Sequence, residues 1–294
     1  MNRDDHLRGV LLVFAGIVVY SADALLIRMS DTGGFTAAFW RGLIAGLTLF
    51  VVFSVQYRGS MKRILTAGGI PMLVSGLLWA LSGICFSLAV RLASTSVALV
   101  CLSTAPFFAA LFSLLILKEK LSPLTLCCIA VSVAGIGYMY KDGIAPGTLA
   151  GNLAAMAAPV IIGLNFTNLH KHPSVSRVAV CMIGGFSGAL ISFAALRGNV
   201  LIPFSSLRYL LLLGAVVLPV GQLMVSLGTK YVPAPEVSLI NSLETVLGIV
   251  YVWAFIGERP DRNCLIGGIA VTLAVALNSL VSLIRRRNRA GMRA

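Results

Sequence analysis

Long apolar stretches alternate with short polar turns along the whole of this 294-residue chain. Each stretch holds roughly 20 residues, the length of helix that crosses a hydrocarbon core about 30 Å thick. Turn-forming residues separate the stretches, as at residues 31–34, 57–60 and 172–174. The pattern predicts ten membrane-spanning helices. Their expected bounds are residues 8–28, 35–56, 67–90, 94–117, 121–140, 148–168, 176–196, 206–229, 233–256 and 263–284.

Composition supports this prediction, because 58% of the residues are hydrophobic and only 11% are charged. A soluble domain keeps about a quarter of its residues charged. The net charge of +13 would suit a nucleic-acid partner, but the basic residues lie in short loops and in the tail at 285–294, as charges that fix membrane topology do. We therefore expect membrane lipid, and no nucleic acid, around the chain.

The distribution of Lys and Arg predicts the orientation. With the N-terminus inside the cell, fifteen of these residues fall on the cytoplasmic side and seven on the outer side. This bias predicts a multi-pass protein of the inner (plasma) membrane with both termini in the cytoplasm. Arg3 and Arg8, the apolar run 9–20 and then Ala22-Asp23-Ala24 also resemble a cleavable signal peptide. We expect this segment to be retained, because the repeat described next needs it as a full helix.

An internal repeat relates the two halves of the chain. A shift of 139 residues places Arg91 on Lys230, Ser103 on Ser242 and Glu119 on Glu258 without a gap. The shift divides the chain into a first five-helix repeat at residues 1–145, a second at 146–284 and a basic cytoplasmic tail at 285–294. Because five is odd, the halves enter the membrane in opposite senses. The expected fold is an all-α membrane protein of ten transmembrane helices built as two inverted five-helix repeats, an arrangement found in many secondary transporters.

Short motifs in both halves resemble the drug/metabolite transporter superfamily, in particular its EamA family, over essentially the whole chain. In the first half they are Tyr20-Ser21-Ala22 leading to Arg28, then Phe39-Trp40-Arg41, then residues 98–106 followed by Glu119. In the second half they are residues 238–244 followed by Gly257-Glu258-Arg259.

The resemblance implies a carrier whose cavity is lined mostly by the third, fourth, eighth and ninth helices. Members of the family mostly export amino acids or other small metabolites, and some import them. One position departs from the pattern. Thr245 stands where family members often have a proline after the Glu, and the equivalent position of the first half holds Pro106. A weaker kink is therefore expected in the ninth helix.

Glu244 is the strongest candidate for a functional residue, because an ionisable group near the middle of a membrane helix is costly and is usually functional. Burial favours its protonated form, so Glu244 is a candidate for coupling proton flux to transport. It is equally a candidate for binding a substrate ammonium group. The alternative is a protonated side chain that only bonds to a neighbouring helix.

Asp23 and Arg41 lie at similar depths in the first and second helices, which suggests an ion pair. The pair is either a gate that breaks as the transporter opens or a permanent structural clamp, and the clamp is the preferred interpretation. Further polar and aromatic residues fall near the midplane and are candidates for lining a substrate cavity. These are Trp79, Ser82, Ser103, Asn165, Phe166, Gln222, Asn241 and Trp253.

Other features favour structural roles. Glu119, Glu236 and Glu258 lie at helix ends, where a carboxylate stabilises free backbone N–H groups. The pairs Gly42–Gly46 and Gly184–Gly188 favour close helix packing. No cofactor or metal site is expected, since the six cysteines show neither a CxxC spacing nor a Cys/His metal spacing. A second copy of the chain, in a homodimer, is a further candidate partner.

Two other classes of protein fit less well. Gly185-Phe186-Ser187-Gly188 matches the GxSG of intramembrane serine proteases, but no histidine follows it to act as the base. A channel would need a continuous polar pore, and the midplane polar residues are too few for one. The sequence therefore predicts a secondary carrier, not an enzyme. Its expected substrate is a small organic metabolite, preferably amino-acid-like, and the alternatives are drugs, nucleosides, vitamins or organic cations.

Overall fold

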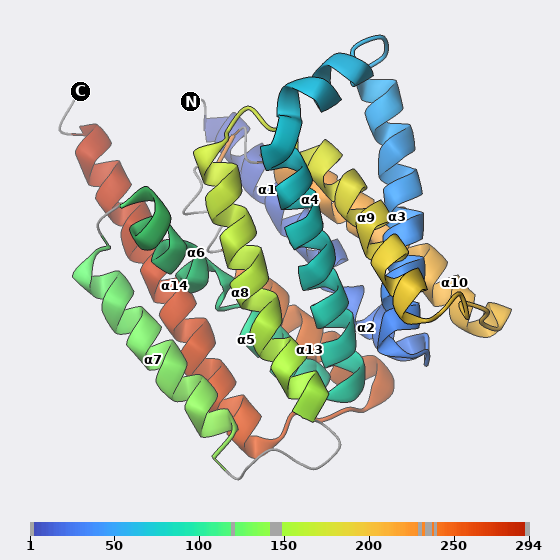
Figure 1. Cartoon of the computed structure of the whole chain (residues 1–294). Helices are drawn as coiled ribbons and strands as arrows, with labels where there is room; N and C mark the ends of the chain where they lie inside the picture. Colours follow the sequence, from blue (N-terminus) through green and yellow to red (C-terminus); the bar gives the residue numbers. More distant parts are fainter. Residues whose placement is uncertain are drawn as a thin grey trace.

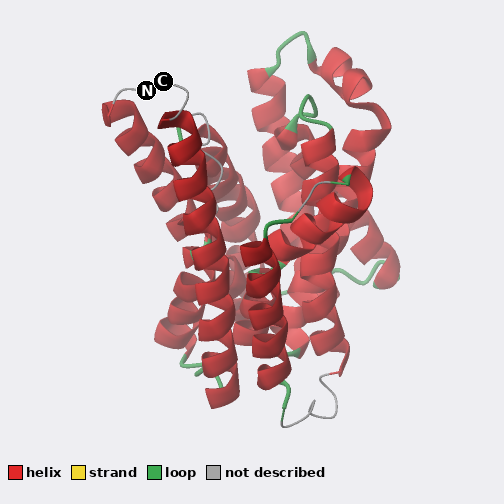
Figure 2. Ribbon diagram, turned by 90° about the vertical axis from the view of Figure 1, so that its left-hand side faces the viewer, coloured by secondary structure: helices red, strands yellow, loops and turns green. Residues whose placement is uncertain are grey.

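The computed structural model describes residues 3–118, 121–141, 149–228, 231–232, 237 and 240–291, and every regular element in these ranges is a helix (Figures 1 and 2). The start of the first helix and the end of the last lie at the same end of the molecule (Figure 2). An even number of membrane crossings places the two ends of a chain in this way.

The first half of the chain forms five spans, and two of these are interrupted. Span one consists of α1 (Arg3–Tyr20) and α2 (Asp23–Met29). Span two is the single helix α3 (Gly34–Gln56), and span three is α4 (Met61–Leu92), which is kinked near its start at Gly69, where φ is +49°. Span four consists of α5 (Thr95–Leu102), α6 (Ala105–Phe112) and a π-helical turn, η1 (Ser113–Leu117), and span five is α7 (Pro123–Met139).

The second half forms five further spans. Spans six and seven are α8 (Leu149–Lys171) and α9 (Arg177–Ala195). Span eight consists of α10 (Phe204–Leu212), a π-helical turn, η2 (Leu213–Val217), and α11 (Leu218–Gly228). Span nine includes α13 (Leu243–Ile256), and span ten is α14 (Arg262–Gly291). Among the residues that the structure describes, eight spans are long and apolar enough to cross a membrane, and the two shorter apolar helices α7 and α13 complete the ten that the sequence predicts.

Helix packing follows the two-fold relation between the halves. Span two (α3) packs along span seven (α9), and span five (α7) lies beside span ten (α14) (Figure 1). Span three (α4) packs along span six (α8). In the two-fold relation span three corresponds to span eight and span six to span one, and these two spans also pack together through α11 and α1. The pairing confirms the predicted fold of two inverted five-helix repeats.

A close contact between α3 and α9 joins the halves through glycines. A Cβ atom on Gly42 of α3 would lie 2.7 Å from the carbonyl oxygen of Gly185 on α9, and the reverse distance is also 2.7 Å. No other side chain leaves room for such an approach, so these positions require glycine. A Cβ atom on Gly184 of α9 would lie 2.8 Å from the ring of Trp79 on α4. The glycine motifs thus serve packing, as expected.

Two interruptions lie near the middle of spans one and four. In span one the hydroxyl of Ser21 donates to the Ile17 carbonyl oxygen at 2.7 Å. In span four the hydroxyls of Ser103 and Thr104 donate to the carbonyl oxygens of Val100 and Cys101 at 2.7 and 2.6 Å. Such bonds from hydroxyl groups back to the helix bend it and separate consecutive helical segments.

Span nine is interrupted at the equivalent position. Ser242, the counterpart of Ser103, is a turn residue between helical Asn241 and the start of α13. The interruption is therefore present although Thr245 replaces the expected proline. The backbone at Ser103, Thr104 and Ser242 keeps right-handed helical φ and ψ angles, so these interruptions are turns between helical segments. Ser103 and Ser242 line a cavity.

A polar network joins the halves at the end of the molecule opposite to the termini. Nε of Arg28 donates to Oε2 of Glu258 at 2.8 Å, and the backbone N–H of Thr95 donates to Oε1 of the same carboxylate at 3.0 Å. Arg91 pairs with Asp31 at 2.9 Å and donates to the carbonyl oxygen of Arg28 at 3.2 Å.

Glu258 therefore stabilises free backbone N–H groups at a helix start, as predicted, but the helix is α5 of the other half of the chain. Thr95 is the first residue of α5, so the carboxylate stabilises the N-terminus of span four. The predicted capping residues Glu119 and Glu236 lie outside the described residues.

Candidate functional site

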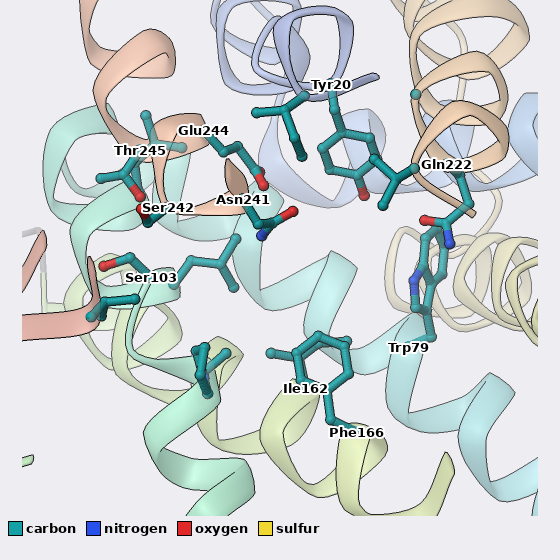
Figure 3. Close-up of a pocket in the computed structure, with 18 residues that line it drawn as sticks. Tyr20, Trp79, Ser103, Ile162, Phe166, Gln222, Asn241, Ser242, Glu244 and Thr245 are labelled. Atoms are coloured by element: carbon teal, nitrogen blue, oxygen red, sulfur yellow. The ribbon is translucent and has the colours of Figure 1, made fainter. Parts of the chain in front are cut away.

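A cavity of about 220 Å³ lies where the interrupted parts of spans one, four and nine meet. Both halves supply its lining, and Figure 3 shows these side chains around one open space. The lining residues are Ile17, Tyr20, Trp79, Leu99, Leu102, Ser103, Ala105, Pro106, Ile162, Phe166, Gly221, Gln222, Val225, Asn241, Ser242, Glu244, Thr245 and Val275. Spans three, four, eight and nine contribute most of them, as the resemblance implied, and spans one, six and ten contribute the rest.

Six of the predicted site residues line this cavity, and they are Trp79, Ser103, Phe166, Gln222, Asn241 and Glu244. Tyr20, Asn241 and Glu244 turn towards the open space from spans one and nine (Figure 3). Further polar side chains reach the cavity as Ser103 of span four and Gln222 of span eight. Ile162 and Phe166 of α8 supply an apolar wall. An apolar wall facing a few convergent polar groups is typical of a site for an organic ligand.

A smaller cavity of about 70 Å³ adjoins the first. The two cavities share Tyr20, Trp79, Leu102, Ile162 and Glu244. The smaller one adds the predicted residues Asp23, Arg41 and Ser82, together with Gly83 and Phe86. Glu244 therefore borders both the large, mostly apolar space and the space beside the Asp23–Arg41 pair.

Asp23 and Arg41 form the ion pair that their equal depth suggested. Nε of Arg41 donates to Oδ1 of Asp23 at 3.1 Å, and Nη2 donates to Oδ2 at 2.5 Å. Both residues are buried, at 4% and 6% exposure. The guanidinium carbon lies 5.8 Å from the centre of the Trp79 ring, within the range of a cation–π contact. One edge of the guanidinium is thus held by Asp23, and one face lies near Trp79.

Two charged groups that line the smaller cavity have donors or acceptors without a protein partner among the described residues. Nη1 of Arg41 makes no hydrogen bond there, and the carboxylate of Glu244 makes neither a hydrogen bond nor an ion pair there. Asp23 already balances the charge of Arg41. An ionised Glu244 therefore leaves the smaller cavity with one net negative charge. A bound proton or a cationic group of a ligand would neutralise this charge.

Two predicted residues lie elsewhere. Trp253 is 52% exposed and lines neither cavity, so its expected place in the lining is not supported. It follows Glu244 by nine residues, which is about two and a half helical turns, so it lies on the opposite face of α13. Asn165 is 1% exposed and also lines neither cavity. Asn168, one turn further along α8, donates to the Pro71 carbonyl oxygen at 2.9 Å, so this face of α8 packs on α4.

Tyr20 was not predicted as a site residue, although it borders both cavities. It is the last residue of α1, directly before the interruption that Ser21 stabilises. An aromatic residue followed by two small residues near the middle of a span was the available signal. Ile162 was missed because an apolar cavity residue has the same sequence character as a packed core residue.

Comparison with known proteins supports the architecture. A solved structure described as "Crystal structure of protein" superposes with a TM-score of 0.64 and 19% sequence identity, over 93% of this chain and 98% of the other. At this identity the likeness shows the fold alone. No curated protein matches the chain significantly.

The family comparison is more specific. The EamA-like transporter family matches the chain twice, over residues 7–141 and 149–280. Each match falls on one set of five spans, and together they cover most of the chain. The ten spans, the inverted repeat and a cavity between the halves are the features expected of such a transporter. The chain is a multi-pass membrane protein and belongs to the EamA-like transporter family, a family of transporters of small molecules.

Proposed function

We propose that the protein is a secondary carrier that moves a small, amino-acid-like organic metabolite across the inner (plasma) membrane by alternating access. The observation that carries the proposal is the position of Glu244: an unpartnered acid, among the described residues, in a cavity between two inverted halves. The positive-inside bias supports an orientation with both termini in the cytoplasm. No enzymatic activity is proposed.

The size and lining of the cavity support a small organic solute. Its volume of about 220 Å³ exceeds the roughly 150 Å³ of an apolar protein cavity that binds benzene. Phe166 is 46% exposed and borders this space. A solute with one apolar part and one polar part matches the two sides of the cavity.

The polar network at the end opposite to the termini supports alternating access. Glu258 joins Arg28 of span one to the start of span four, and it comes from the other half of the chain. Rocking of one half against the other would break these contacts at this end. We propose that the network stabilises a state that is closed at this end.

Proton coupling at Glu244 is part of the proposal. The loaded and the empty carrier must each tolerate the half-buried carboxyl group of Glu244, and a proton neutralises this group when no cationic ligand is present. A proton and a ligand ammonium group would then compete for the same carboxylate. Such competition would exchange the ligand for a proton across the membrane.

The outer surface supports contact with lipid. Large apolar side chains of α3, such as Leu47, Val51 and Val55, are 50–60% exposed on the side of this helix that faces away from the bundle. We propose that this surface contacts hydrocarbon chains of the bilayer.

The experiment begins with a thermal-shift screen of amino acids, nucleosides, vitamins and organic cations on the purified protein. Uptake of the stabilising compounds is then measured in proteoliposomes. The proposal predicts uptake that saturates with the solute concentration and is competed by the unlabelled solute. Flux that rises without saturation would favour a channel instead, and no flux of any stabilising compound would contradict the proposed function.

A further inference from the structure

We propose that Arg41 and Glu244 form a two-point site for a zwitterion, in which Glu244 binds the ammonium group and Nη1 of Arg41 binds the carboxylate of an α-amino acid with an apolar side chain. This inference rests on the proposed function. The inference assigns Arg41 a role in ligand binding in addition to its ion pair with Asp23.

The hydrogen bonds of Arg41 leave one edge of its guanidinium available. A guanidinium carries five N–H donors in a planar fork. Asp23 accepts from the edge formed by Nε and Nη2, at 3.1 and 2.5 Å. The other edge, formed by Nη1 and the second N–H of Nη2, has no protein acceptor among the described residues. A second carboxylate fits that edge with two parallel hydrogen bonds.

Gly83 keeps this edge accessible. A Cβ atom at Gly83 of α4 would lie 2.9 Å from Nη1 of Arg41, closer than an unstrained contact. Gly83 and Arg41 both line the smaller cavity, so the missing side chain leaves space in front of the guanidinium. Any side chain at this position would cover the available donors or push Arg41 away.

Glu244 supplies the other end of the site. It borders the same small cavity as Arg41, and its carboxylate has no partner among the described residues. With a zwitterion bound, the charges alternate in sign from Asp23 through Arg41, the ligand carboxylate and the ligand ammonium group to Glu244. Each charged group then has an opposite charge beside it, which a low-dielectric site requires.

The larger cavity would hold the ligand side chain. Glu244 borders both spaces, and the wall of the larger one opposite to the polar groups includes Ile162 and Phe166 (Figure 3). An apolar side chain attached to the same carbon as the two charged groups would extend into this space.

The test compares three matched ligands for each of two side chains. The leucine set is L-leucine, 3-methylbutylamine without the carboxylate, and 4-methylpentanoate without the amine. The phenylalanine set is L-phenylalanine, 2-phenylethylamine and 3-phenylpropionate. Binding to the purified protein is measured by calorimetry. At least one amino acid should bind about tenfold or more tightly than both of its analogues, since each lost charged hydrogen bond costs roughly 1.5–3 kcal/mol.

Two variants separate the two ends of the site. Glu244→Gln should weaken binding of the amino acid and the amine about tenfold or more and leave binding of the acid unchanged. Gly83→Ala should weaken the amino acid and the acid and leave the amine unchanged, without removing either charge of the Asp23–Arg41 pair. Gly137→Ala is the matched control, because a Cβ atom at this helical glycine would meet nothing within 4 Å.

Three results would overturn the inference. The first is an amine that binds as tightly as its amino acid, and the second is a Gly83→Ala variant that weakens the amine as much as the amino acid. The third is binding of none of the six ligands. If other solutes are still transported in the proteoliposome screen, the proposed carrier function stands while the zwitterion site fails.

Discussion

Glu244 and Ala105 occupy equivalent positions in the two halves, and both line the same cavity. They directly follow the interruptions of spans nine and four, near Ser242 and Ser103. The two-fold relation therefore places one acid and one methyl group across a shared space. This asymmetry places the only acid of the described lining on the side of span nine.

The first prediction concerns the acid itself. Glu244→Gln keeps the shape of the side chain and removes its charge, so the protein should fold and reach the membrane at a normal level. Transport should fall at least about tenfold, because the ligand loses a charged partner. Trp253→Leu, on the face of α13 opposite to Glu244, is the control and should leave uptake unchanged. Unchanged uptake by Glu244→Gln in proteoliposomes would count against a role in binding.

The second prediction concerns pH. If a proton and the ligand compete for Glu244, ligand affinity should increase as the pH rises and protons leave the carboxylate. The ligand should become less tightly bound as the pH falls. Glu244→Gln should remove this dependence over the same range. A wild-type affinity that does not change with pH would argue against proton coupling at this residue.

The third prediction concerns the Asp23–Arg41 pair. Removing one partner leaves a buried charge unpaired and costs about 3–5 kcal/mol, so Asp23→Ala and Arg41→Ala should greatly lower thermal stability in detergent. The exchange Asp23→Arg with Arg41→Asp should recover much of the stability, because the pair is restored. It should not recover transport, because the guanidinium then lies on the other helix. An exchanged variant that is no more stable than the two single variants would contradict the importance of the pairing.

The fourth prediction concerns the network that joins the halves. Glu258→Ala removes both the ion pair with Arg28 and the acceptor at the start of α5, and it should cost about 1–2 kcal/mol of stability. Glu258→Gln keeps an acceptor for the Thr95 N–H and should cost less. Asp31→Asn is a control, since its side chain is 89% exposed in its pair with Arg91. Thermal unfolding of the purified variants checks this order, and equal midpoints for Glu258→Ala and wild type would refute it.

The fifth prediction compares two tryptophans. Trp79 borders both cavities and lies near Arg41, whereas Trp253 is on the outer face of α13. Trp79→Leu should reduce ligand affinity several-fold through lost aromatic and cation–π contacts, worth roughly 0.5–2 kcal/mol. Trp253→Leu should leave affinity unchanged. The same loss of affinity in both variants would show that neither acts through the cavity.

Much of the fold could be predicted because membrane spans follow from length and hydropathy. The repeat supplied the two-fold relation, since charged residues such as Glu119 and Glu258 recur at the same spacing as the helices. Asp23 and Arg41 could be paired because consecutive spans are neighbours and their depths match. The close approach of Gly42 to Gly185 was only partly predictable, because a GxxxG motif indicates a close contact and does not name its partner.

The remaining features depend on which face of a helix a residue occupies and on contacts between residues that are far apart in the sequence. Trp253 was placed in the cavity from its depth alone, but depth does not say which face of a helix a residue occupies. Counting nine residues from Glu244 would have placed it on the opposite side. The contact between Arg28 and Glu258 spans 230 residues and joins a helix end to a loop, so no local pattern indicates it. Tyr20 was missed because it borders the cavities at the point where span one is interrupted, and the sequence alone did not predict that interruption.

The most direct test of the proposed function is counterflow in proteoliposomes. Vesicles preloaded with a high concentration of the identified unlabelled solute are diluted into a trace of the labelled form. A carrier with one central site should accumulate the label transiently above its external concentration, and Glu244→Gln should abolish this overshoot. Label that only equilibrates, with or without the preloaded solute, would contradict alternating access through the cavity around Glu244.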